Sequence, residues 1–199
     1  MSAKIYIEGG GDSKELHIRC REGFRRLIEK CGHEKQMPKL IACGSRVAAF
    51  DDFKTAHKNK SGNKYVAILI DSEDPVTDIE KPWKHLNTRD GWTKPSEADD
   101  EQVLLMTTCM ETWIASDRTA LKKHYGAKLT ENTLPPLVNM EARQRLDIQN
   151  ALVKATSSCK NAYEKGKRSF EILSELSPTE LRQHLPSFKR FERVLKHKL

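Results

Sequence analysis

The sequence predicts an α/β protein with a mostly parallel sheet flanked by helices. The clearest evidence is the nearly all-apolar run at residues 65–70, which is typical of a strand covered by helices on both faces. Two shorter strand-like segments precede it, and each is followed by helical periodicity. With 199 residues, of which 37% are hydrophobic, the chain is long enough to bury a real core.

The first strand is predicted at residues 4–8, whose side chains alternate between the two faces, and three glycines end it. A helix is expected next, with Asp12 as its N-cap and Glu15 three residues on, as in a capping box. Gly32 is expected to stop this helix. Its apolar side recurs at helical spacing: Leu16, Cys20, Phe24, Leu27 and Cys31.

The next elements follow the same alternation. A second strand is predicted at residues 39–43, a short helix at 46–57 and a third strand at 65–70. Residues 75–101 are rich in proline and acidic residues and indicate a long connection with only short elements, and loops of that length tend to be functional. A fourth strand is expected at residues 102–108, followed by helix from residue 110.

Beyond Pro135-Pro136 the pattern is helical. Segments are expected near residues 141–158, 168–175, 178–184 and 187–197. We interpret residues 1–199 as one domain, with an α/β core at 1–134 and a helical C-terminal extension at 135–199, because about 60 residues of helix are enough to cover one face of a sheet.

The positive charge is concentrated in this last part. Residues 1–141 hold 22 basic and 22 acidic side chains, whereas residues 142–199 hold 13 and 6, so the whole net charge of +7 lies there. A basic part beside a neutral one indicates a phosphate-rich partner such as nucleic acid, with Lys165, Lys167 and Arg168 as candidate phosphate contacts. The alternative is a set of solvated basic helices.

Several protein classes do not fit the sequence. No stretch approaches the roughly 20 apolar residues that cross a bilayer, and Glu8 interrupts the apolar start too early for a secretory signal. We therefore expect a cytoplasmic protein without membrane association. Five cysteines without a C-x-x-C pair are typical of reduced thiols, and the histidines lack the spacing of a zinc peptidase.

Carboxylates follow two of the predicted strands at the point where each strand ends. Glu8 ends the first, and Asp71-Ser72-Glu73-Asp74 ends the third. Ligands of open α/β sheets gather at the carboxyl ends of the strands, and Asp71 and Glu73 would point to the same side if the strand continued through them. Three such carboxylates repel one another unless a divalent cation lies among them, and an all-oxygen set favours Mg²⁺ or Mn²⁺ over zinc.

The glycine turn indicates phosphate binding. Gly9, Gly10 and Gly11 open onto a helix N-terminus, where backbone N–H groups and the helix dipole hold phosphates. The turn lacks the spacing of a Walker A loop and of a dinucleotide fingerprint, which argues against an NTPase or dinucleotide site. Lys14 and Arg46 lie just past strand ends and are candidates to neutralise a phosphate.

A strand ending in Glu-Gly and a later apolar strand ending in Asp-x-Asp or Asp-x-Glu resemble the Toprim fold of topoisomerases, primases and the overcoming-lysogenization-defect nucleases. The matching residues are Ile7-Glu8-Gly9 and Ile70-Asp71-Ser72-Glu73. Over nearly its whole length, the chain more closely resembles a bacterial Toprim-like family, the domain of unknown function 4276. The segments that carry this likeness are residues 6–16, 42–46, 69–76, 109–113 and 163–167.

The resemblance implies a Mg²⁺- or Mn²⁺-dependent nuclease that hydrolyses phosphodiester bonds of DNA or RNA, alone or beside an ATPase subunit in defence against phage. Asp71 and Glu73 would hold the metal, and Glu8 would join them or act as general acid/base. Asp74 is a further candidate ligand, and Glu111 is a candidate for a second metal.

Two other interpretations remain open at this stage. A non-catalytic Toprim-like adapter or sensor would dock to an ATPase partner. A phosphatase of another α/β family would need D-x-D-x-[TV], which the segment after the third predicted strand lacks. The oligomeric state is also open, including a homodimer.

Overall fold

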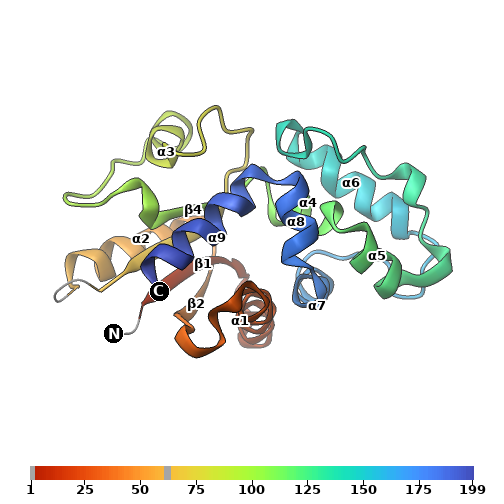
Figure 1. Ribbon diagram of the computed structural model, residues 1–199, viewed down its shortest axis with the longest axis horizontal. Coiled ribbons are helices and arrows are strands. Elements are labelled where there is room, and N and C mark those ends of the chain that lie inside the picture. The colour runs from red at the N-terminus through yellow and green to blue at the C-terminus, as the bar shows by residue number, and fades with distance from the viewer. Residues whose placement is uncertain (1–2, 61–63) are drawn as a thin grey trace.

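A computed structural model describes residues 3–60 and 64–199 and has an α/β fold (Figure 1). Its sheet contains four parallel strands in the order β2-β1-β3-β4. In chain order these are β1 (Lys4–Gly10), β2 (Lys39–Gly44), β3 (Val66–Asp71) and β4 (Val103–Met106). Parallel strands place all their carboxyl ends at one edge of the sheet, so β1 and β3, which pair directly, end side by side.

Helices connect the strands and, with the loops between them, form the C-terminal part. The α-helices of the described residues are α1 (Lys14–Ile28), α2 (Arg46–Lys58), α3 (Pro82–Asp90), α4 (Met110–Ser116), α5 (Arg118–Tyr125), α6 (Arg145–Thr156), α7 (Lys167–Glu175), α8 (Pro178–His184) and α9 (Pro186–Lys198). In Figure 1, α9 crosses beside β4, whereas α5 and α6 lie away from the sheet.

The two faces of the sheet have separate cores. On one face α2 and α3 pack Phe50, Phe53 and Trp83 against alternate residues of β3 and β4. The other face is covered by α1 and by the helices from α4 onward. Its core is one cluster of buried apolar side chains whose members range from Ile5 in β1 to Leu195 in α9. Residues of the α/β part and of the C-terminal helices therefore share one apolar core on this face. This cover is needed because the side chains of β3 are apolar on both faces of the sheet.

The predicted elements are present, but several of their ends differ. Strand β1 extends past Glu8 to Gly10, and α1 ends at Ile28, before a π-helical segment (Glu29–His33) that contains Gly32. The cap of α1 is Ser13, whose hydroxyl accepts from the Leu16 N–H at 3.4 Å, and not Asp12 as expected. Strand β4 is shorter than predicted and ends at Met106. Strand β3 ends at Asp71, and Glu73 has a left-handed backbone with φ 69°, so the strand does not continue through Glu73.

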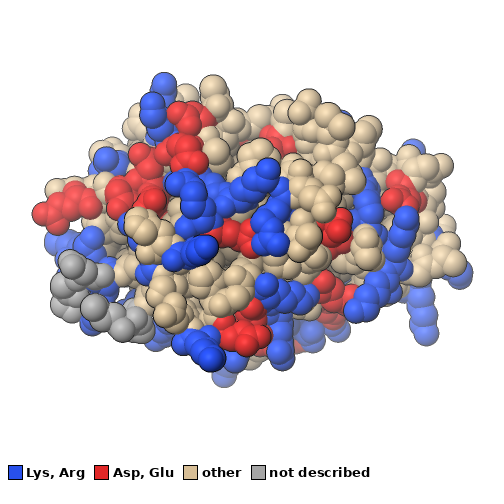
Figure 2. Space-filling view, viewed as in Figure 1, with Lys and Arg blue, Asp and Glu red and all other residues tan. Residues whose placement is uncertain are grey.

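The basic residues of the C-terminal part are spread among acidic ones. Figure 2 shows Lys and Arg interspersed with Asp and Glu on the face where α9 lies in Figure 1. Ion pairs such as Arg193 with Glu80, and Lys198 with Glu101 at 2.7 Å, account for part of this charge. No helix in the described part of the chain combines the length and apolar character needed to cross a bilayer.

Candidate metal and phosphate site

Three carboxylates converge at the carboxyl edge of the sheet. One oxygen each from Glu8, Asp71 and Glu73 lies within 4.8 Å of the other two. The pairing of β1 with β3 brings Glu8 and Asp71 together. Glu73 reaches the same point through a turn, held by a hydrogen bond from its N–H to the Thr108 carbonyl at 2.8 Å. The site therefore contains the predicted three residues, although the third arrives by a different backbone path.

Glu8 is mostly buried near the carboxyl end of β1. Its Oε2 accepts from the Asp71 N–H at 3.2 Å and lies 3.5 Å from a guanidinium nitrogen of Arg46. Burial raises the pKa of the Glu8 carboxyl, Arg46 partly offsets this, and the carboxylate of Glu73 raises it again. Glu8 thus holds its proton to a higher pH than an ordinary glutamate.

Asp71 is the most enclosed member of the three, with 6% of its surface exposed. Its Oδ1 accepts from the Met110 N–H, at the start of α4, at 2.8 Å. Burial raises the pKa of Asp71 well above its ordinary value, and the nearby carboxylates of Glu8 and Glu111 raise it further. A buried carboxylate beside two others costs electrostatic free energy, which a bound cation would relieve.

Glu73 is held by two arginines from distant parts of the chain. Its Oε2 pairs with Arg145 at the start of α6 and lies 3.6 Å from Arg89 in α3. Asp74 does not join the cluster of three: its side chain is 55% exposed and accepts from Arg89 Nε at 2.9 Å.

Arg46 is engaged by groups of the protein itself. Its guanidinium donates to Asp90 at 2.8 Å and to the main-chain carbonyl of Asp71, and it lies 5.0 Å from the ring centre of Trp92. Together with its contact to Glu8, these interactions make Arg46 a support for the Glu8 carboxylate and for the main chain at Asp71. The structure thus surrounds Arg46 with internal partners at the position where sequence reasoning expects a phosphate ligand.

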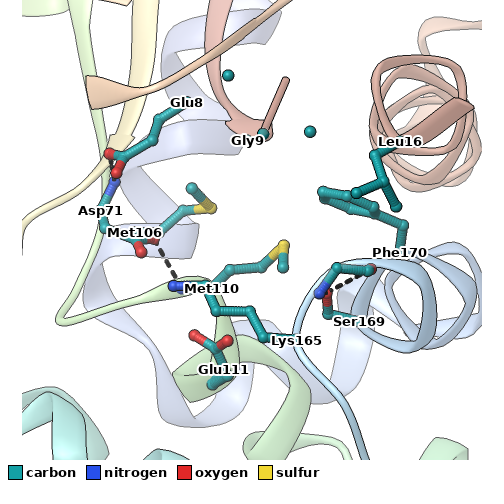
Figure 3. A pocket seen from close by; sticks show the side chains of 14 residues that line it. Glu8, Gly9, Leu16, Asp71, Met106, Met110, Glu111, Lys165, Ser169 and Phe170 are labelled. Carbon is teal, nitrogen blue, oxygen red and sulfur yellow. Dashed lines mark hydrogen bonds between the residues drawn. The ribbon is translucent and has the colours of Figure 1, made fainter. Parts of the chain in front are cut away.

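A cavity of about 320 Å³ opens beside the carboxylates. Glu8, Asp71 and Glu111 line one part, and Gly9, Gly10 and Gly11 line another. Figure 3 shows Glu8 and Asp71 on one side, Leu16 and Phe170 opposite them, and Met106 and Met110 between. Glu73 belongs to the carboxylate cluster but does not line this cavity, so the cluster lies at the cavity's edge.

The glycine turn is packed tightly behind the cavity. A Cβ atom at Gly10, whose φ is 93°, would lie 2.6 Å from the ring of His17. The same ring donates a hydrogen bond from Nε2 to the Gly11 carbonyl at 2.6 Å, which links the turn to α1. Glycine is therefore required at position 10 for both backbone conformation and space.

Glu111 lies fully buried on the cavity wall but outside the cluster of three. Its Oε1 accepts from the Tyr163 hydroxyl at 2.8 Å, and its Oε2 accepts from the Gln149 amide at 3.3 Å. Both oxygens thus have partners from the C-terminal helical part, at a position where the sequence suggests a second metal.

The four basic candidates are placed differently. Lys165 is exposed and lines the cavity, and its ammonium lowers the pKa of Glu8 and Asp71. Lys14 and Lys167 are exposed at the starts of α1 and α7 and do not line the cavity. Arg168 pairs with Glu171 at 2.9 Å. Of these four, only Lys165 is in place to contact a ligand in the cavity.

The family model for the domain of unknown function DUF4276 matches residues 7–196, almost the full length of the chain. The chain belongs to the DUF4276 family. Neither a curated protein nor a solved structure matches it. The matched region includes the carboxylate cluster, the cavity and the C-terminal helices of this DUF4276 protein.

The donor set of this DUF4276 protein fits a hard divalent cation. Three carboxylate oxygens within 4.8 Å, without a cysteine or histidine among them, are the ligand type that Mg²⁺ and Mn²⁺ prefer. The main-chain N–H groups of Asp71 and Met110 orient two of the carboxylates.

Sequence reasoning did not find the arginines that hold the cluster. Arg89 and Asp90 lie at the end of α3, inside the long connection, and Arg145 begins α6. No local pattern marks them, because their roles depend on side chains 15 to 72 positions away. The sequence pattern also does not distinguish the apolar side chains that line the cavity from ordinary core residues, since Leu16 and Phe170 follow ordinary helical periodicity.

Proposed function

We propose that this DUF4276 protein is a Toprim-like phosphodiesterase that uses Mg²⁺ or Mn²⁺ to hydrolyse DNA or RNA. The observation that carries the proposal is the convergence of Glu8, Asp71 and Glu73 at the edge of a cavity. Bringing like charges together in a partly buried place costs free energy, so a convergent cluster of carboxylates beside a cavity indicates a functional site. The glycine turn and Lys165 on the same cavity support a phosphate-containing substrate.

The side chains divide the work as follows. Asp71 and Glu73 hold the cation, and Glu8 completes the donor set or transfers a proton at the reacting phosphate. The raised pKa of Glu8 brings its carboxyl closer to the pH at which it can both accept and return a proton. When bound, the cation supplies charge neutralisation at the scissile phosphate. Lys165, which lines the same cavity, contacts the phosphate.

We place this activity in the cytoplasm, as the effector of an ATPase-associated phage-defence system. In this proposal residues 1–199 act as one unit, because the C-terminal part contributes Lys165 and Arg145 to the site. The excess positive charge of residues 142–199 supports association with nucleic acid.

One observation favours a second candidate, a non-catalytic adapter or sensor that docks to an ATPase. Arginines already neutralise two of the carboxylates: Arg46 contacts Glu8, and Arg145 and Arg89 contact Glu73. An internal cation competes with a metal for the same oxygens. In an adapter, these pairs would serve to hold the edge of the sheet in one conformation.

Calorimetric titration with Mg²⁺ and Mn²⁺, paired with cleavage of mixed DNA and RNA, distinguishes the two. The wild type is compared with Glu8→Gln and Asp71→Asn, and Glu22→Gln serves as the control because Glu22 is an exposed carboxylate on α1. The nuclease proposal expects binding and cleavage that both site variants lose and the control keeps. Absence of binding and cleavage at millimolar metal would overturn it and leave the adapter.

A further inference from the structure

The cavity beside the carboxylates has one wall that the metal chemistry does not use. Leu16 and Phe170 line this wall opposite Glu8 and Asp71, and Met106 and Met110 extend it between the two sides (Figure 3). A cation and a phosphate need oxygen and nitrogen partners, not thioethers and a phenyl ring. The cavity therefore has a polar part and an apolar part. A ligand that fills it would contain both a charged or polar group and an apolar group.

The apolar wall is built from elements far apart in the sequence. Leu16 comes from α1, Met106 ends β4, Met110 begins α4, and Phe170 comes from α7. The ring of Phe170 lies against the glycine turn, where its Cζ would be 3.4 Å from a Cβ at Gly9. The aromatic ring and the glycine turn thus lie next to each other on one cavity wall.

We propose that this wall receives the base of an unpaired nucleotide whose phosphate lies at the carboxylate cluster. This proposal rests on the proposed function and specifies its substrate as single-stranded nucleic acid. A cavity of about 320 Å³ has the size of small-ligand sites, and an aromatic side chain with flexible methionines accommodates a flat ring. Lys165 on the same cavity complements the charge of the adjoining phosphate.

The polar groups on the wall cannot distinguish one base from another. The Ser169 hydroxyl accepts from the Gly166 N–H at 3.0 Å and donates to the Gly166 carbonyl at 2.7 Å, so it is occupied by the cap of α7. The thioethers of Met106 and Met110 are weak acceptors. Stacking without base-edge hydrogen bonds tolerates every base, so the site accepts all four.

A base within a duplex cannot enter such a cavity. To reach the Phe170 ring, the base must leave its stack and its partner, which costs several kcal/mol in a duplex and little in a single strand. Preference for a single strand therefore follows from the shape of the site and needs no further recognition element.

Fluorescence of 2-aminopurine tests this inference without relying on cleavage. A single-stranded oligonucleotide with 2-aminopurine at one end is titrated with protein in chelator at low salt, and anisotropy of a distant label reports binding in the same samples. We expect quenching as the base stacks, about tenfold weaker binding in Phe170→Leu, and no quenching when the same oligonucleotide is a duplex. Placing adenine, cytosine, guanine or thymine at the end as competitors should change the midpoint by less than about threefold.

Phe50→Leu is the matched control, because Phe50 and Phe170 are both 5% exposed and Phe50 lies on the opposite face of the sheet. It should bind and quench like the wild type, and thermal melts verify that both variants are folded. Wild-type binding without quenching, absence of binding, or equal behaviour of Phe170→Leu and the wild type would each overturn the inference. Loss of the proposed activity appears separately, as absence of cleavage in Mg²⁺ with quenching intact.

Discussion

The buried charges at the two ends of the sheet have opposite kinds of surroundings. At the carboxyl end, Asp71 lies beside two other carboxylates, and burial raises its pKa well above the ordinary value. At the amino end, Arg190 of α9 is 4% exposed and donates to the carbonyls of Val103 at 2.8 Å and Asp100 at 2.5 Å. Its Nε lies 3.3 Å from Glu80.

The difference separates a structural charge from a functional one. Arg190 is surrounded by acceptors, so its burial fastens α9 to the start of β4 and requires nothing further. Asp71 is buried beside carboxylates of its own sign, which outweigh the Met110 N–H and Lys165 and make its ionised form unfavourable in the absence of a cation. The comparison predicts opposite effects on stability when each charge is removed.

The largest effect is expected for Arg190→Met. The substitution keeps most of the apolar stem but removes the hydrogen bonds from the guanidinium to the main-chain carbonyls of Val103 and Asp100, and we expect the free energy of unfolding to fall by about 3 kcal/mol. Urea denaturation followed by circular dichroism measures this change. Metal binding should stay within about twofold of the wild type, because Arg190 lies at the other end of the sheet and sites that share no partner act independently. A change at both ends would break the comparison.

Asp71→Asn should change the free energy of unfolding in the opposite direction. Asparagine keeps an oxygen for the Met110 N–H and removes the charge. The free energy of unfolding of the metal-free variant should therefore be about 1 kcal/mol higher than that of the wild type. The same denaturation experiment in chelator decides this. A variant less stable than the wild type would show that the ionised Asp71 is held by compensating contacts, as Arg190 is.

The stability of the metal-free wild type should depend on pH in a defined direction. The pKa values of Glu8 and Asp71 are raised in the folded state, so the folded protein binds their protons more tightly than the unfolded chain does. This contribution is fully present below the unfolded-state pKa of about 4 and is lost as pH rises through the folded values. Above about pH 4, the free energy of unfolding of Asp71→Asn should fall less with rising pH than that of the wild type. The difference between the two declines should be less than about 1 kcal/mol.

One other carboxyl must be considered in this measurement. Burial raises the pKa of Glu141 to about 7, against hydrogen bonds from the Ser187 N–H and hydroxyl that lower it. Glu141 is present in both proteins, so its contribution cancels in the difference between wild type and Asp71→Asn. Identical pH profiles for the two proteins would contradict the assignment of the raised pKa to the cluster.

The smallest effect is expected for Arg145→Gln. Its guanidinium pairs with Glu73 but is one-third exposed, and solvent weakens the interaction. Removing this competing cation should tighten Mg²⁺ binding by about threefold in calorimetry. Weaker binding in Arg145→Gln would instead show that Arg145 holds Glu73 in the geometry that the metal needs, and the conservative variant Arg145→Lys should then keep most of the wild-type affinity.

Local patterns in the sequence determined the strands, most helices and the position of two carboxylates. The period-two pattern of residues 4–8 and the apolar run at 65–70 depend on neighbouring residues only, and both segments form strands of one parallel sheet. Because these strands are parallel and adjacent, Glu8 and Asp71 had to meet at one edge. The sequence placed both carboxylates at the carboxyl edge of a parallel sheet, but the strand order that makes β1 and β3 neighbours came from the structure.

Tertiary structure alone decided how those charges are held and what lies opposite them. The left-handed turn at Glu73, the pairing of Arg145 with Glu73 and the bond from Tyr163 to Glu111 join residues that no periodicity relates. Phe170 faces the cavity only because α7 packs along α1. Helix and strand patterns follow from the geometry of a few consecutive residues, whereas ion pairs and cavity walls follow from which faces of distant helices pack together.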